Sequence, residues 1–223
     1  TSATATSANG GNQPITVRPE LGRIRNSAGT YYRVVYFGTG RFLGLSDLNT
    51  TAPSSAVAQA IYAVKDTGSD IGVFPTSGTL VAQTLNTAVS PRTIPSPVAV
   101  DWSAKNGWYI TLPVGERVNV DPRLQLGTLV VLSNYPDDNY CTIDGTSLLY
   151  ALDYTSGTAI KSDMAVGFPV GNALANAVTL VLLPTGKLVA IIPLSDATVS
   201  NEETPHKPGA GIGVKRIGWR ELN

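Results

Sequence analysis

The stretch Thr128-Leu-Val-Val-Leu-Ser-Asn134, followed by Leu148-Leu-Tyr-Ala-Leu-Asp-Tyr-Thr-Ser-Gly157, decides the fold. Each piece opens with an apolar run that has the length of a β-strand. The second piece ends in a polar turn with Asp153 and Gly157. Aspartate accepts hydrogen bonds from a turn backbone, and glycine tolerates the positive φ that tight turns need. The stretch therefore predicts a strand, a polar excursion, a second strand and a closing turn.

The same pattern occurs once more, nearer the start of the chain. Arg33-Val-Val-Tyr-Phe-Gly-Thr-Gly40 precedes Ala60-Ile-Tyr-Ala-Val-Lys-Asp-Thr-Gly68. Repeated strand–loop–strand units with such a closing turn are typical of β-propeller blades. At about 40–50 residues per blade, the chain would make about four or five blades. We therefore expect a small closed ring or part of a larger one.

The remaining sequence also favours strands. No run has a sustained helical period, and 22 glycines and 15 prolines leave little room for long helices. Short helices are expected at most in Ala52–Ala60 and Pro169–Ala177, where alanine is frequent. The predicted fold class is all-β and propeller-like, with strands at 33–37, 60–64, 107–112, 127–132, 147–152, 179–183 and 187–192.

The predicted organisation is one domain with a short arm. Residues 1–12 are small and polar, which indicates a flexible N-terminal arm, and residues 13–223 are assigned to the propeller-like domain. The sequence begins TSATATSANGGNQ, without an initiator methionine or the charged start of a secretion signal. We interpret it as a mature or excised fragment. No run reaches the roughly 18 apolar residues that span a bilayer.

Composition excludes several function classes. Only 14% of residues are charged, against roughly 25% in average soluble proteins, which favours a secreted or surface protein. Lys plus Arg and Asp plus Glu both number 16, so no basic face is predicted and nucleic acid is not an expected partner. Cys141 is the single cysteine. It is expected to be a free thiol or to be bridged to a residue outside this chain.

Six motifs occur in order from Gln13 to Leu222, and together they resemble the PilC/PilY family of type IV pilus proteins. The motifs are Gln13-Pro-Ile-Thr16 with Arg18-Pro-Glu-Leu21; Val34-Val-Tyr-Phe-Gly-Thr-Gly-Arg-Phe-Leu-Gly44 with Ser46-Asp-Leu48; Gln59-Ala-Ile-Tyr-Ala-Val-Lys-Asp66; Gly107-Trp-Tyr-Ile-Thr-Leu-Pro-Val-Gly-Glu-Arg-Val118 with Asp121-Pro122; Cys141 with Gly145-Thr-Ser-Leu-Leu-Tyr-Ala-Leu-Asp153; and Lys215-Arg-Ile-Gly-Trp-Arg-Glu-Leu222.

The resemblance implies a fold and a role. Members of this family carry a modified β-propeller at their C-terminus, and this chain corresponds to its later blades. They sit at the pilus tip or cell surface, support pilus assembly by opposing retraction, and take part in adhesion and twitching motility. The expected partners are pilin-like subunits or other pilus components, a host or abiotic surface, and either the missing blades or a second copy of the chain. A partial ring is also expected to leave unpaired strand edges.

The sequence departs from the family pattern at the calcium loop. Some members bind calcium through an Asp-rich loop, which lies upstream of the segment matched by Gln13–Thr16. No D-x-D-x-D-G or D-x-N-x-D-G run occurs here, and no R-G-D triplet occurs either. The adhesive N-terminal region of the family also has no counterpart. We therefore expect no calcium site and no cofactor in this chain.

Several residues are of types that occur in catalytic or binding sites, but their sequence context predicts structural roles. Gly38-Thr-Gly-Arg41 lacks the G-x-x-x-x-G-K-[ST] pattern of a phosphate loop and predicts a turn that ends a strand. Glu116 beside Arg117 predicts an ion-paired turn. Arg41 and Arg117 are candidates for pairing with carboxylates between blades. Trp102, Trp108 and Trp219 are expected to be packing residues, with carbohydrate stacking as the alternative.

The remaining candidates concern metals and hydrolysis. Asp137, Asp138 and Asp144 flank Cys141 and would suit a weak cation site or, more simply, a solvated loop. His206 is the single histidine, in a Pro/Gly-rich segment, so neither a zinc site nor a Ser-His-Asp triad is expected. We predict no catalytic, cofactor-binding or metal-binding residues.

Three functions remain open at this point. The first is a non-enzymatic pilus-associated protein. The second is a structural subunit of an extracellular filament. The third is a propeller enzyme of the quinoprotein type, for which the sequence offers no supporting Asp cluster or vicinal cysteine pair.

Overall fold

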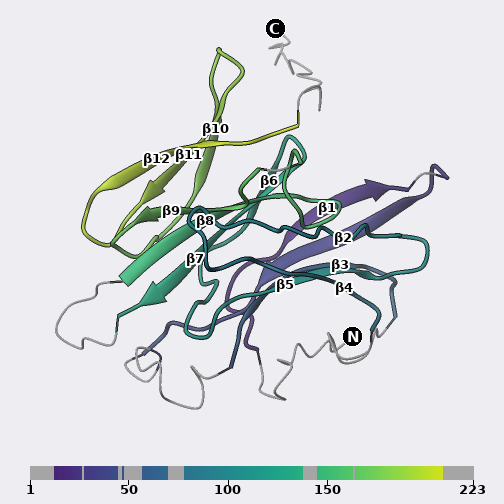
Figure 1. The fold of residues 1–223 in the computed structure, drawn as a ribbon, viewed down its shortest axis with the longest axis horizontal. Helices are drawn as coiled ribbons and strands as arrows, with labels where there is room; N and C mark the ends of the chain where they lie inside the picture. The colour runs from purple at the N-terminus through teal and green to yellow at the C-terminus, as the bar shows by residue number, and fades with distance from the viewer. Residues whose placement is uncertain are drawn as a thin grey trace, which may run out of the picture.

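The computed structural model describes residues 13–26, 28–44, 47, 57–69, 78–137, 145–162 and 164–207. These residues form strands and connections without a helix, and none of them could cross a membrane as one. The strands follow one another across the molecule in three sheets (Figure 1). They are β1 Glu20–Arg25, β2 Tyr31–Gly38, β3 Ala60–Lys65, β4 Val81–Gln83, β5 Gly107–Thr111, β6 Arg123–Gln125, β7 Thr128–Pro136, β8 Gly145–Asp153, β9 Gly167–Gly171, β10 Thr179–Leu182, β11 Leu188–Pro193 and β12 Val199–Thr204.

The first two sheets share one plan. The first sheet has the order β1-β2-β3-β5-β4 and is antiparallel except for the β4–β5 pair, and the second has the antiparallel order β6-β7-β8-β9. The two sequence repeats therefore occupy equivalent places, as the second and third strands of their sheets. The third sheet has the order β10-β11-β12.

The closing turns form as the repeat predicts. The backbone amide of Gly68 donates to the Asp66 carboxylate at 3.1 Å, and the amide of Thr155 donates to that of Asp153 at 2.9 Å. Gly68 and Gly157 both adopt a φ of 71°. The shared Asp and Gly are thus explained by shared turn geometry.

The sheets stack face to face, and the second sheet is covered on both sides. Leu129 and Val131 of β7 pack with Trp108 against the first sheet. Val130 and Leu132, on the opposite face of β7, pack with the third sheet. The continuous apolar run of β7 is what a strand buried on both faces needs. Burying each of these side chains stabilises the fold by about 1.5–3 kcal/mol.

All seven predicted strands are present, and the missed strands are short or polar. β4 and β6 have three residues each, and β12 has the sequence VSNEET. The helix expected over 169–177 is wrong: β9 covers its first residues, and Ala175 forms a bridge with Leu194. The described residues give three sheets where four or five blades were expected, because the connections 39–59, 66–80 and 84–106 lengthen the first unit.

Some predictions fall outside the described residues. These concern the arm at 1–12, most of the second possible helix at 52–60, Asp138, Cys141, Asp144, Trp219 and the closing motif 215–222.

Candidate functional site

The first strands of the three sheets lie next to one another. β6 contacts β1 on one side and β10 on the other, and a groove of about 360 Å³ opens between the three strands. We call it the inner groove. Its lining is formed by Glu20, Arg123, Leu124, Gln125, Val178, Thr179 and Leu180. Because it combines a carboxylate, a guanidinium and an amide with apolar side chains, it suits a peptide segment of mixed polarity.

Two features hold the walls of the inner groove together. A Cβ on Gly22 of β1 would lie 2.8 Å from Cδ2 of Leu124 and 2.9 Å from the ring of Tyr36, so glycine permits the close approach of β1 and β6. Before these strands, the backbone amide of Arg18 donates to Oδ1 of Asp121 at 2.9 Å. The walls of the inner groove are therefore held by the packing of the Leu124 and Tyr36 side chains against Gly22 and by the hydrogen bond between Arg18 and Asp121.

A second surface lies on the outward face of β1 and β2. Residues of β1 alternate, so that Ile24 is buried against the second sheet while Leu21 is 71% exposed. Tyr31 at the start of β2 is 57% exposed. A groove of about 590 Å³ runs along this face, lined in part by Leu21 and Val35. We call the exposed residues Leu21, Arg23, Arg25, Tyr31 and Arg33 the arginine ledge.

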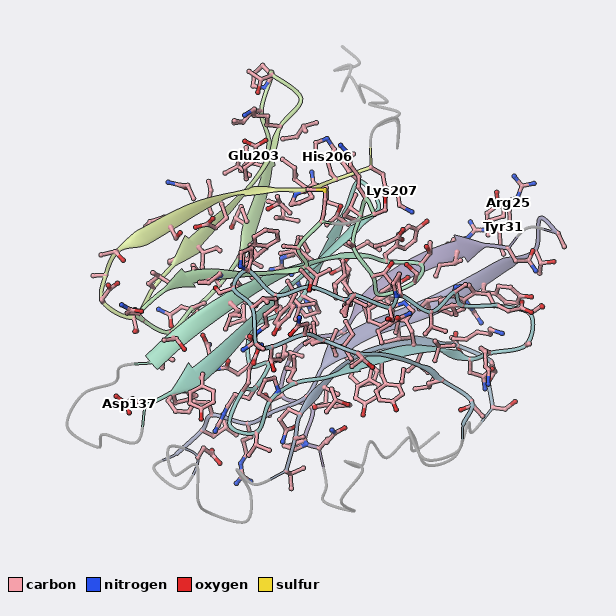
Figure 2. The ribbon with its side chains drawn as sticks, in the orientation of Figure 1. Arg25, Tyr31, Asp137, Glu203, His206 and Lys207 are labelled. Carbon is pink, nitrogen blue, oxygen red and sulfur yellow. The ribbon has the colours of Figure 1, made fainter. Side chains whose placement is uncertain are left out.

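The arginine ledge is positively charged. The guanidinium carbons of Arg23 and Arg25 lie 4.6 and 5.6 Å from the centroid of the Tyr31 ring, and Figure 2 shows Arg25 and Tyr31 side by side. Arg33 pairs with Asp66 at 3.2 Å. Within the described residues neither Arg23 nor Arg25 forms an ion pair, so two cationic side chains remain uncompensated on this face.

The interior contains a polar cluster centred on Glu116. The Glu116 side chain is fully buried. Its carboxylate accepts hydrogen bonds from Nη1 of Arg92 at 2.6 Å, Oγ of Ser133 at 2.6 Å and Oη of Tyr150 at 2.8 Å. Arg92 also donates to Tyr150. Burial, and next the negative charge of Glu116, raise the pKa of Tyr150 far above its ordinary value. The cluster links the two connections that precede and follow β5 with the strands β7 and β8.

The Glu116 cluster revises one prediction. Glu116 does form an ion pair, but with Arg92, which is 24 residues earlier in the chain. Arg117 donates to the backbone oxygens of Gly115, Arg41 and Asp47. The role of Arg92 was not predicted, because a buried ion pair between residues far apart in the chain leaves no local pattern in the sequence.

Asn134 forms a second polar junction, between the second sheet and the segment leading to β10. Its Nδ2 donates to the Ala175 oxygen at 2.9 Å, and its Oδ1 accepts from the Ala175 amide at 2.8 Å. The Ser147 hydroxyl lies 2.7 Å from Oδ1 of Asn134 and 2.6 Å from the Ala173 oxygen, and its one hydrogen is shared between these two acceptors. These bonds satisfy a buried amide side chain and fix where the chain crosses to the third sheet.

β2 ends at Gly38, as the Gly38–Arg41 segment predicts, but the residues that follow run between neighbouring segments and do not form the predicted turn. The Thr39 amide donates to the Ala60 oxygen at 2.9 Å, and Arg41 pairs with Asp47 at 2.9 Å. This carboxylate pair is local, within one connection, rather than between blades. Burial alone would raise the pKa of Asp47, but hydrogen bonds from the Leu43 amide and Arg41 outweigh it and hold the pKa below its ordinary value.

Of the candidate metal and histidine residues, the structure describes Asp137 and His206. Asp137 lies beside a small surface hollow with Tyr135 and Thr146, and the described residues contain no group of three possible metal ligands. The residues on either side of His206 are held against the second sheet and the turn that follows β8. Thr128 donates to the Pro205 oxygen at 2.9 Å, and Lys207 pairs with Asp153 at 2.7 Å; Figure 2 labels His206 and Lys207.

Two of the three tryptophans are packing residues, as predicted. Trp108 is fully buried and Trp102 is 5% exposed. Their indole nitrogens donate to the Tyr154 oxygen at 3.2 Å and the Thr155 oxygen at 2.9 Å. The two rings therefore join β5 and the connection before it to the turn after β8.

Comparison with known proteins identifies the fold. No protein-family model and no curated protein matches the chain. Among solved structures, the crystal structure of the Pseudomonas aeruginosa PilY1 C-terminal domain matches with a TM-score of 0.60 and 19% sequence identity. The match covers 91% of this chain and 48% of that domain, so the chain spans about half the length of the domain it matches. The chain therefore has the fold of part of a PilY1-type C-terminal domain.

Proposed function

We propose that this chain is a non-enzymatic binding domain of a type IV pilus-associated protein at the bacterial cell surface. The observation that carries the proposal is the structural match to the PilY1 C-terminal domain over 91% of the chain. The ordered family motifs from Gln13 to Leu222 point the same way. Within this role we include support of pilus assembly against retraction, adhesion and twitching motility.

The hydrogen bonds of the buried polar side chains favour a binding role over a catalytic one. The most buried carboxylate, Glu116, accepts three hydrogen bonds from neighbouring side chains. The described surface instead offers open grooves. We assign the contact with a pilin-like subunit to the inner groove, because rigid strands from all three sheets form its walls.

The proposal is tested in the bacterium that carries the gene. Deleting the gene should reduce the amount of pilin recovered from sheared cells and the size of the twitching zone, and the wild-type gene should restore both. Arg123→Glu reverses a charge in the inner groove and should fail to restore them. Lys187→Glu, at the turn between β10 and β11, is the matched control and should restore them. Normal piliation in the deletion strain would overturn the pilus role.

A further inference from the structure

A surface hollow lies where β7 ends and β8 begins. Its volume is about 330 Å³, near the lower end of the roughly 300–1,000 Å³ of small-ligand sites. We call it the tyrosine hollow. None of its residues lines the inner groove, so the two are separate sites. The lining of the tyrosine hollow is formed by Tyr135, Asp137, Gly145, Thr146 and Asn172.

Strand pairing places an aromatic and a polar side chain together in the tyrosine hollow. Tyr135 of β7 lies opposite Thr146 of β8, and cross-strand partners share one face of a sheet. Val131, on the same face of β7, packs against the first sheet. Tyr135 lies farther along the strand and is 38% exposed. Figure 2 shows Asp137 at this end of the molecule, far from Tyr31.

The Tyr135 ring rests against the backbone of the connection that follows β5. A Cβ on Gly115 would lie 2.8 Å from Cε2 of the ring and 3.0 Å from its Cζ and hydroxyl oxygen, so glycine permits this contact. The same connection is bonded to β7, because the backbone amides of Arg117 and Asn134 each donate to the other residue's oxygen, at 2.9 and 2.8 Å. The position of the ring is therefore set before a ligand arrives, which lowers the entropic cost of binding.

The exposed part of the Tyr135 ring is available to a ligand. Tyr31 and Tyr135 are the aromatic side chains among the exposed residues of the described ranges. The Tyr31 ring already contacts the guanidinium groups of Arg23 and Arg25. Tyr135 has no aromatic or cationic neighbour of this kind among the residues that the structure describes.

Polar side chains of complementary types surround the ring. Thr146 and Asn172 are exposed, and neither side chain has a hydrogen-bond partner within the described residues. A threonine hydroxyl and an asparagine amide both donate and accept hydrogen bonds, whereas the carboxylate of Asp137 only accepts them. The lining therefore offers donors and acceptors, with one negative charge and no positive charge.

We propose that the tyrosine hollow binds a neutral sugar. A pyranose ring carries C–H groups on a face, which suit contact with an aromatic ring, and hydroxyl groups around its edge, which donate and accept hydrogen bonds. Tyr135 contacts the C–H face, and Thr146, Asn172 and Asp137 bind the hydroxyl groups. The carboxylate disfavours acidic sugars by charge repulsion. This inference does not depend on the pilus role.

The binding test uses four small glycosides and the full chain. Saturation-transfer NMR titrations measure binding of methyl β-galactoside, methyl β-glucoside, methyl α-mannoside and, as the acidic comparison, methyl β-glucuronide. We expect at least one neutral glycoside to bind with a Kd on the order of 1 mM, because an open hollow covers only part of a sugar. The glucuronide should bind more weakly than that glycoside.

Variants then locate the sugar. Tyr135→Ala should weaken binding by at least ~tenfold, whereas Tyr135→Phe keeps the ring and should stay within about twofold of the wild type. Asn172→Ala should weaken binding by about fivefold through the lost hydrogen bonds. Tyr31→Ala removes the other exposed aromatic ring and is the matched control, which should bind as the wild type does. Circular dichroism checks folding, and Asn172→Ala carries the test if Tyr135→Ala does not fold.

The proposal is overturned if none of the three neutral glycosides binds, or if the glucuronide binds as tightly as they do. Unchanged binding by folded Tyr135→Ala and Asn172→Ala, or an equal loss in Tyr31→Ala, would show that the sugar does not occupy the tyrosine hollow. Either result leaves the pilus role to the deletion experiment, so the two proposals fail separately.

Discussion

Arg92 and Glu116 form an ion pair in which Nη1 of the arginine lies 2.6 Å from Oε2 of a glutamate whose side chain is completely buried. The pair joins the connection before β5 to the connection after it, and Tyr150 and Ser133 complete the hydrogen bonds of the carboxylate. Breaking such a pair from one side leaves an uncompensated buried charge. The pair therefore stabilises the contact between the first two sheets.

We expect Glu116→Gln to lower the free energy of unfolding by about 3–5 kcal/mol, because it leaves the Arg92 cation without its counterion. Urea denaturation measures this, with the exposed Glu203→Gln as the control that should change little. Adding Arg92→Met to Glu116→Gln should cost less than the sum of the two single changes. Additive costs would mean that the two residues do not act as a pair.

We expect the free energy of unfolding of the Asp47→Asn variant to change less with pH in the acid range than that of the wild type. The folded-state pKa of Asp47 lies below its ordinary value of 3.8. Its carboxylate therefore contributes stability above that value, and the contribution is lost as the pH falls through the lowered folded pKa. Urea midpoints should show the wild type as the more stable protein at neutral pH, with the difference shrinking below about pH 4. A difference that stays constant with pH would contradict this.

We expect Tyr36, Tyr62 and Tyr150 to stay protonated in the folded protein when the pH passes 10. Burial is the main cause that raises the pKa of each above the ordinary value of 10.0. Groups of this kind contribute stability below pH 10, which is lost as the pH rises toward the raised folded values. A spectroscopic titration should find at least three of the nine tyrosines ionising only on unfolding. Ionisation of all nine near pH 10 with the fold intact would argue against this packing.

We expect Gly22→Ala to destabilise the protein by about 1–3 kcal/mol, because its Cβ would meet Leu124 and Tyr36 at less than 3 Å. The inner groove should widen as β1 moves from β6. Gly44→Ala is the matched control, since a Cβ there meets nothing within 4 Å. Thermal melting compares the two variants, and equal stability would mean that β1 and β6 are not in close contact.

The sequence was enough to predict the strands that form the core. The repeat around Tyr62 and Tyr150 identified the central strands of two sheets, because their apolar runs and Asp–Gly turns are local signals. β1 was missed, although Leu21, Arg23 and Arg25 alternate with Gly22 and Ile24 in the manner of a half-buried strand. The described residues form three sheets rather than four or five blades, and the sequence did not predict this because the length of a connection within a sheet leaves no pattern of apolar residues.

The candidate surfaces were harder to predict than the fold. The inner groove unites residues from β1, β6 and β10, which are more than fifty residues apart along the chain from one strand to the next. The buried ion pair between Arg92 and Glu116 likewise depends on how two connections pack together. Only the stacked sheets bring these residues together, so no local pattern could have identified them.

The central claim is that this chain binds a pilus component through the inner groove, and a photo-crosslinking residue in place of Gln125 tests it most directly. We expect illumination of living, piliated cells to link this position covalently to a pilin-like subunit, identified by mass spectrometry. The same probe in place of Lys187 should not form that adduct. If neither position captures a pilus protein, or if both do so equally, binding through the inner groove is contradicted.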